Sequence, residues 1–381
     1  MSIEGELRVT LHSDGQRVRH VGLHSTRPLL APRLLQGRRP ADAATLVPRL
    51  YAICGQAQGT AAAAALRAAG AEAAGMPAPD AWTVVLEALQ ETLWRLLIDA
   101  PRSLALPPQA AAVAPARAAV AQAMTALAAE PSQRQPALAA AAKALGDIAS
   151  LHVYGGDPAH WLAGTDAAAF DRWRDTAATL PARALALLAQ TAPGLGRSDT
   201  ALMPGLDDES WWSVVVPALQ QDPLFAQAPT WGGIPVETGA LARQRQQPLV
   251  AALIARDGHC AATRLAARLV EFAALLGTLA EGADDAAGWV RAWPLDTVVG
   301  LAAVQTARGL LLHRVRLHAG LIADYRIVAP TEWNFHPQGA LFRGIVGMQA
   351  GDDTTLLART RLAVHALDPC VGFEIEVVHD A

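Results

Sequence analysis

The chain has 381 residues, enough for a sizeable core in one large domain or in two to three smaller ones. Hydrophobic residues make up 52% and charged residues 17%, which excludes a disordered chain. The net charge is −4, the pI is near 6.3, and no strongly basic block occurs. Nucleic acid is therefore not expected as a partner.

The compartment is suggested by the termini and the cysteines. The N-terminal sequence MSIEGELRVTLHSDG has no apolar signal core, and no apolar run reaches the ~20 residues that span a bilayer. There are three cysteines, Cys54, Cys260 and Cys370. An odd and sparse count argues against a disulfide framework. We expect a cytoplasmic protein that does not enter the membrane.

The first half of the chain predicts one β-hairpin and then helices. Residues 3–22 should form the hairpin, because apolar and polar residues alternate from Leu7 to Leu11 and Ser13-Asp14-Gly15 supplies a turn. Helical patterns follow over 41–74, with breaks at Pro48 and near Cys54-Gly55, and over 81–99.

Residues 104–150 are rich in alanine and proline. We interpret them as two helices with a flexible joint near residues 131–136, and a poorly ordered low-complexity segment is the alternative.

The second half predicts further helices and one more hairpin. The hairpin covers 309–329, with its turn at His318-Ala319-Gly320. The helices are expected over 167–190, 208–219, 237–256, 261–281, 338–349 and 354–366. The predicted class is mostly α with small antiparallel β elements (α+β), in a single domain over 1–381, and no period of 20–50 residues repeats.

Standard catalytic signatures such as G-x-S-x-G, H-E-x-x-H and the Walker A loop do not occur. Cys54 and Cys370 stand beside Gly or Pro, where a helix can begin or end, and a helix N-terminus stabilises the thiolate that binds metal. Taken alone, each cysteine fits a buried apolar role better than a ligand role. Cys260 is predicted to lie inside an alanine-rich helix.

Seven short segments change this interpretation. They are IEGELR at 3–8, GRRPADA at 37–43, RLYAICG at 49–55, ETGALAR at 237–243, ARGLLLH at 307–313, APTEWN at 329–334 and DPC at 368–370. In the same order they resemble I-E-G-H-L-R, G-R-D-P-x-D-A, R-I-C-G-x-C, E-V-G-P-L-A-R, P-R-G-x-x-x-H, V-P-T-T-W-N and D-P-C-x-x-C of the nickel–iron hydrogenase large subunit. Residues 75–230 carry little resemblance. The resemblance implies a truncated large-subunit-like fold.

The chain departs from that family at the metal ligands. The family holds nickel and iron with two C-x-x-C pairs, and the second cysteine of each pair corresponds to Ala57 and Phe373 here. Neither a methyl nor a phenyl group replaces a soft thiolate ligand. The family's histidine after the first pair is Ala61, and its magnesium ligands correspond to Glu376 and Pro32. We therefore expect no nickel, no magnesium and no catalytic residue. These departures argue against an active hydrogenase, and retention of the two cysteines argues against a quinone-reducing relative.

The resemblance implies instead an assembly scaffold of the HupK and HoxV type. Such a protein would hold iron transiently as Fe(CN)2(CO), with Cys54 and Cys370 as the metal ligands and their sulfur atoms within about 8 Å. Arg308 and Thr331 match the positions that hydrogen-bond cyanide, Pro330 would face carbon monoxide, and Glu4 is also assigned to the cofactor site.

Two kinds of partner follow from this reading. They are maturation proteins of the HypC/HypD iron-delivery type and the hydrogenase large-subunit precursor. The alternative is a metal-free chaperone or adaptor that binds maturation proteins by mimicking the large subunit.

Overall fold

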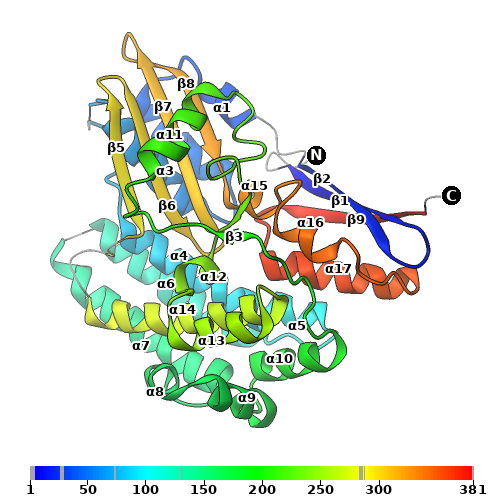
Figure 1. The fold of residues 1–381 in the computed structure, drawn as a ribbon. Coiled ribbons are helices and arrows are strands. Elements are labelled where there is room, and N and C mark those ends of the chain that lie inside the picture. The colour runs from blue at the N-terminus through cyan, green and yellow to red at the C-terminus, as the bar shows by residue number, and fades with distance from the viewer. Residues whose placement is uncertain are drawn as a thin grey trace.

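A computed structural model of the chain describes residues 5–25, 30–72, 74–129, 131–282, 286 and 288–379. These residues form a four-stranded sheet with helices on both faces, a layer of helices beneath it, and a three-stranded sheet beside the C-terminal helices (Figure 1). Most described residues are helical and the strands are short, which confirms the predicted class.

The larger sheet is antiparallel, with strand order β5-β6-β7-β8. Its strands are β5 (Val290–Asp296), β6 (Val299–Thr306), β7 (Gly309–His318) and β8 (Leu321–Val328). Helix α3 (Gly55–Ala68) covers one face and α11 (Trp211–Gln221) covers the other. All eight residues of β6 are buried because the strand has helices on both sides. At Gly300 a Cβ atom would lie 2.1 Å from the carbonyl oxygen of Ala65, so glycine lets α3 cross the sheet closely.

The helical layer holds the largest apolar core. Helix α14 (Ala261–Glu281) lies within it and packs against α4, α7 and α12. The other helices of this layer are α4 (Ala81–Trp94), α5 (Ala100–Ser103), α6 (Ala110–Ala129), α7 (Arg134–Ala149), α8 (Pro158–Gly164), α9 (Ala167–Thr176), α10 (Leu180–Thr191), α12 (Ala240–Gln244) and α13 (Pro248–Asp257). Helix α4 continues through a π-helical turn, Arg95–Asp99, toward α5.

The smaller sheet brings the two ends of the chain together. Strands β1 (Glu6–Ser13) and β2 (Val18–Ser25) form the N-terminal hairpin, and β9 (Gly372–His379) pairs with β1 in parallel. The helices near this sheet are α16 (Ala340–Ile345) and α17 (Asp353–Leu367). The remaining elements are α1 (Leu30–Leu35), α2 (Pro40–Leu46), α15 (Pro330–Asn334), β3 (Ala201–Leu202) and β4 (Val236–Glu237).

Both predicted hairpins form, but each belongs to a larger sheet. The prediction missed β5, β6 and β9, so the view of two small antiparallel elements was incomplete, and β1–β9 is a parallel pair. The helices predicted over 167–190 and 237–256 are each two helices, because Pro181 and Pro248 stand in the first turn of a new helix. The segment 104–150 forms two helices, α6 and α7, joined by a 3-10 turn at Pro131–Gln133. Its flexibility stays a prediction.

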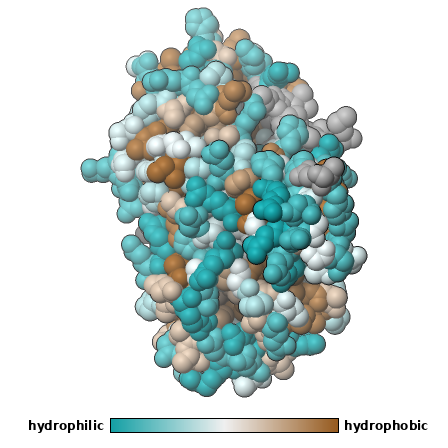
Figure 2. Space-filling model, turned by 45° about the vertical axis from the view of Figure 1, so that its right-hand side comes forward, coloured by the Kyte–Doolittle hydropathy of each residue, from teal (hydrophilic) through white to brown (hydrophobic). Residues whose placement is uncertain are grey.

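Within the part of the chain that the structure describes, α6 is the one helix with the length and apolarity of a membrane-spanning helix. These criteria are length and composition only, and α6 also contains Arg117 and Pro115. On the face drawn in Figure 2, apolar residues lie in small groups among hydrophilic ones.

Candidate functional site

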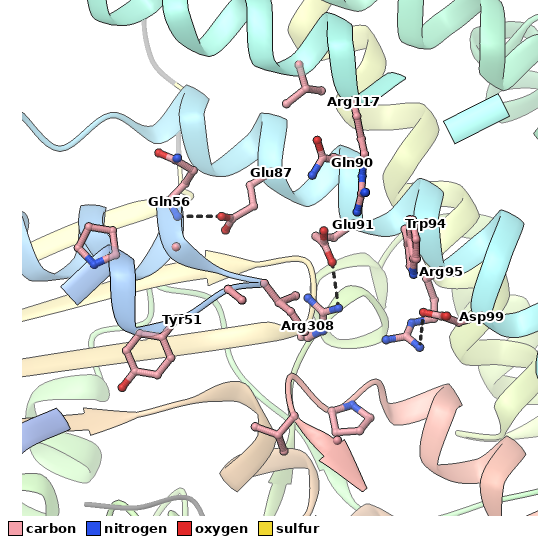
Figure 3. Close-up of a pocket in the computed structure, with 18 of the residues that line it drawn as sticks. Tyr51, Gln56, Glu87, Gln90, Glu91, Trp94, Arg95, Asp99, Arg117 and Arg308 are labelled. Carbon is pink, nitrogen blue, oxygen red and sulfur yellow. Dashed lines mark hydrogen bonds and ion pairs between the residues drawn. The ribbon is translucent and has the colours of Figure 1, made fainter. Parts of the chain in front are cut away.

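A cavity of about 830 Å³ lies where five parts of the chain meet. Its walls come from residues 48–56 at the start of α3, from α4, from α6, from Arg308, and from residues 365–373 (Figure 3). The segments that resemble hydrogenase motifs at 49–55, 307–313 and 368–370 therefore converge on one place.

Cys54 occupies the residue before the first turn of α3, as the Gly55 break predicted. Gly55 is required here because a Cβ atom would lie 2.8 Å from the carbonyl oxygen of Pro48. The Glu87 carboxylate on α4 accepts hydrogen bonds from the backbone N–H groups of Gln56, at 2.8 Å, and Ala57, at 3.2 Å. Burial raises the pKa of Glu87 to about 8 despite these two bonds.

Cys370 lies in the connection between α17 and β9 and is buried. Its backbone N–H donates to the Thr331 hydroxyl at 3.1 Å, and its Sγ lies 2.9 Å from the same oxygen. The hydroxyl therefore lies beside the sulfur, and it is the donor of this pair whenever Cys370 is a thiolate, since a thiolate has no proton to give. Thr331 therefore fixes the position of Cys370.

The neighbours of both cysteines face the same cavity. Ile53 and Gly55 line it next to Cys54, and Pro369 and Val371 line it next to Cys370, whereas neither cysteine is itself among the described residues of its wall. Burial alone would lower the pKa of Arg308, but Asp368, Glu91, Cys370 and Cys54 together raise it above its usual value. Both thiols are thus near one guanidinium group.

Arg308 lies in the tight turn between β6 and β7. Asn334 holds its carbonyl oxygen through a 3.2 Å hydrogen bond, and the Arg308 guanidinium is buried. Nη2 donates to Glu91 at 3.1 Å, and Nε donates to Asp368 at 3.1 Å. Figure 3 shows Glu91 pointing from α4 toward this guanidinium. The guanidinium is therefore anchored on two sides at the cavity wall.

Asp368 stands at the centre of a buried ionic network. Its carboxylate accepts from Arg95 and Arg308 and lies 3.8 Å from Arg268. Burial alone would raise the pKa of Asp368, but the three guanidinium groups outweigh it and lower the pKa to about 2. Arg95 also pairs with Asp99 at 3.0 Å. This network joins α4, the β6–β7 turn, α14 and the end of α17.

The other predicted residues lie as follows. Pro330 begins α15 and is buried, and the described wall of the cavity includes neither Pro330 nor Thr331. Glu4 lies outside the described residues. Cys260 precedes α14 and has extended backbone, so the prediction that it lies inside a helix was wrong. Its side chain contacts Thr263 at 3.3 Å.

Phe373 and Ala57 stand on the two cysteine segments. Phe373 lines the cavity and its ring meets His365 edge-on at 5.0 Å, whereas Ala57 is fully buried in α3. No described group of three or more His, Cys, Asp and Glu side chains is arranged to hold a metal ion. The described protein atoms therefore offer two thiols near the cavity.

The carboxyl groups that face Arg308 were not predicted from the sequence. Glu87, Glu91 and Arg95 follow one another at four-residue spacing, so they share one face of α4 and its extension. Charged residues on an otherwise apolar helix were the available signal, since a buried charge requires a partner.

The fold is that of the nickel-dependent hydrogenase large subunit. The family model described as nickel-dependent hydrogenase matches residues 247–375. The Ni-Fe-Se hydrogenase of Desulfovibrio vulgaris Hildenborough in the reduced state aligns with a TM-score of 0.58 at 17% identity, over 94% of each chain. The reduced, active Ni-Fe-Se hydrogenase of Desulfomicrobium baculatum aligns with a TM-score of 0.55 at 15% identity, over 94% of this chain and 95% of that one.

Curated relatives narrow this class. The hydrogenase expression/formation protein HoxV of Cupriavidus necator is 32% identical, over 93% of this chain and 92% of its own. The hydrogenase expression/formation protein HupK of Azotobacter vinelandii is 33% identical, over 98% and 99%. The chain belongs to the HoxV/HupK family of hydrogenase expression/formation proteins, which confirms the resemblance.

Proposed function

We propose that this chain is a non-catalytic scaffold of hydrogenase maturation that carries an Fe(CN)2(CO) unit as cargo. Its relatives are named expression/formation proteins, which supports the maturation role. The observation that carries the proposal is the meeting of the two cysteine segments and Arg308 around one cavity. In this proposal, Cys54 and Cys370 supply two thiolate ligands to the iron. The other three ligands, two cyanides and one carbon monoxide, belong to the cargo.

The charge of the cargo agrees with the charge of the site. Fe(II) with two cyanides is neutral, and two thiolates make the bound unit a dianion. The Arg308 guanidinium supplies a fixed positive charge at the cavity wall, and its pKa lies above its usual value. A guanidinium suits an anionic acceptor such as a cyanide nitrogen. The apolar side chains of Ile53, Val371 and Phe373 line the same cavity and suit carbon monoxide.

Two ligands rather than four agree with a carrier that must release its cargo. Ala57 and Phe373 offer no sulfur, so neither a nickel site nor hydrogen turnover is part of the proposal. The volume of about 830 Å³ falls in the range of sites for whole small molecules. An iron atom with three diatomic ligands leaves room for groups of a donor or acceptor protein. HypC/HypD-type proteins would deliver the unit in the cytoplasm, and the large-subunit precursor would receive it.

The test uses the full chain produced together with the maturation proteins. Infrared spectroscopy should find cyanide and carbon monoxide bands on the purified protein, together with bound iron. Cys54→Ala and Cys370→Ala should each remove the bands and the iron and stop hydrogenase maturation. Cys260→Ala is the matched control and should change neither, because Cys260 packs against Thr263 and its sequence neighbours do not line the cavity, unlike those of Cys54 and Cys370.

A different result would support the metal-free alternative. If the wild-type protein shows no bands and no iron while both cysteine variants still support maturation, the chain acts as a chaperone or adaptor. Loss of iron in the Cys260 variant alone would show that the wrong cysteines were chosen.

A further inference from the structure

A buried hydrogen-bond chain leads to Cys54 from the sheet. The Cys54 sulfur lies 3.7 Å from Gln58 Nε2, and Gln58 Oε1 lies 2.9 Å from Nε2 of His313. Nδ1 of His313 lies 2.8 Å from the hydroxyl of Tyr325. Gln58 and His313 are fully buried, and Tyr325 is 3% exposed. This hydrogen-bond chain therefore runs through the core from β8 across β7 to α3, and the side chains of Tyr325, His313 and Gln58 are all buried.

The direction of each bond follows from the donors available. Gln58 presents its amide N–H to the sulfur, so its oxygen must accept from His313. His313 then carries its proton on Nε2, which leaves Nδ1 as an acceptor for the Tyr325 hydroxyl. Every bond donates toward Cys54. The reverse direction would place the amide oxygen against the sulfur, where a metal-bound thiolate has no proton to give.

Cys370 receives a comparable donor by a shorter route, since the Thr331 hydroxyl lies 2.9 Å from its sulfur. The Cys54 and Cys370 sulfurs thus each lie within hydrogen-bond distance of a neutral side chain, Gln58 and Thr331 respectively. A hydrogen bond to a ligating sulfur spreads the negative charge of the bound unit and fixes the sulfur's position. The Thr331 bond is local, whereas the Gln58 bond depends on two further residues.

We propose that Tyr325, His313 and Gln58 are positioning residues that hold the Cys54 sulfur as a hydrogen-bond acceptor, ready to ligate a metal. This proposal rests on the proposed function, because it takes Cys54 as a ligand. None of the three touches the cargo. Tyr325 acts on the sulfur only through His313 and Gln58. Removing the Tyr325 hydroxyl therefore tests the hydrogen-bond chain and not a direct contact with the sulfur.

The experiment measures Cd²⁺ binding to the full chain without cargo, since Cd²⁺ binds thiolates and gives a sulfur-to-metal absorption band. Tyr325→Phe keeps the ring and removes one hydroxyl. Gln58→Leu removes the donor, keeps a similar side-chain volume and adds no metal ligand. Changes in residues that hydrogen-bond a metal ligand typically alter metal affinity by about 10–100-fold. We expect a loss of at least about tenfold for Gln58→Leu, and about 3–10-fold for Tyr325→Phe. Both variants should shift the absorption band to longer wavelength.

The matched control is Tyr154→Phe. The Tyr154 hydroxyl donates to the carbonyl oxygen of Leu269 inside the helical layer, and it is as buried as that of Tyr325. This variant should lose stability similarly but bind Cd²⁺ as the wild type does, with the same band.

Two other outcomes overturn the inference in different ways. If Tyr325→Phe and Gln58→Leu match Tyr154→Phe in affinity and band position, the hydrogen-bond chain does not act on Cys54, and the proposed function stands. If Cys54→Ala binds Cd²⁺ as tightly as the wild type, Cys54 is not a metal ligand, and both proposals fail.

Discussion

The walls of the cavity and the helical layer beneath them are stabilised by different interactions. Around Arg308 and Asp368, charged side chains are buried and each is held by partners from distant parts of the sequence. In α6 and α7, the buried side chains are alanine, leucine and valine. Buried charges demand particular partners, whereas apolar packing demands mainly volume. Three of the seven hydrogenase-like segments, 49–55, 307–313 and 368–370, reach the first region, whereas α6 and α7 lie in the range 75–230, which carries little resemblance.

The largest expected effect separates the two regions directly. Asp368→Ala removes the carboxylate shared by Arg95, Arg268 and Arg308, and so leaves buried positive charge uncompensated. Breaking a buried ion pair in this way costs about 3–5 kcal/mol. Urea denaturation should show that loss in the free energy of unfolding, with loss of iron retention as well. A cost below about 1 kcal/mol would mean that the network contributes little to stability.

A cavity in the helical layer should cost stability without affecting the cargo. Leu145 on α7 is fully buried in the largest apolar core, and α7 does not line the cavity. Leu145→Ala should lower the free energy of unfolding by about 2–5 kcal/mol. Under conditions where the variant stays folded, its cyanide and carbon monoxide bands should equal those of the wild type. Shifted bands would show that the layer and the site are coupled.

The buried Glu87 carboxyl at the cavity wall should make the free energy of unfolding depend on pH. Its pKa in the folded protein is about 8, above the ordinary 4.5, because burial favours the neutral acid. The stability that comes from burying Glu87 as the neutral acid is fully present below about pH 4.5 and is lost as the pH rises through 8. Between these values the slope approaches about 1.4 kcal/mol per pH unit. Arg308 and Glu91 also face this carboxyl, and their opposite effects on its pKa are smaller than that of burial.

Glu87→Gln removes the titrating group and keeps an oxygen that can accept from Gln56 or Ala57. Urea denaturation of both proteins at pH 5, 6, 7 and 8 should give a flatter profile for the variant. Equal slopes over this range would assign the titration to another residue.

The contrast between local interactions and contacts between distant segments explains which parts of the fold the sequence predicted. Alternation and turn residues located both hairpins, and proline and glycine located the break before α3, because these signals are local. Strand β9 was missed because its parallel partner, β1, lies more than 350 residues away in the chain. Strand β6, buried on both faces, shows no alternation in burial.

The residues of the site likewise divide into those that the sequence predicted and those that it did not. Cys54, Cys370 and Arg308 came from the resemblance, and the structure brings their segments to one cavity. Glu91 and the partners of Asp368 could not be predicted, because an ion pair between distant elements leaves no spacing in the sequence. The hydrogen-bond chain from Tyr325 to Cys54 was hidden for the same reason, although His313 was part of a motif.

The smallest expected effect concerns an ion pair in the helical layer. Lys143 and Asp147 on α7 lie 2.7 Å apart, as close as buried pairs of the cavity wall, but both side chains are mostly exposed. Water and salt screen such a pair, and ordering two long side chains costs entropy, so exposed pairs contribute only about 0.2–1 kcal/mol. Lys143 also precedes Asp147 by four residues, which is the weaker orientation along a helix. Lys143→Ala should therefore change the free energy of unfolding by less than about 0.5 kcal/mol. A double-mutant cycle with Asp147→Ala, measured by urea denaturation at low and high salt, isolates the pair. A coupling energy near that of a buried pair would show that distance, and not burial, sets the strength of ion pairs in this molecule.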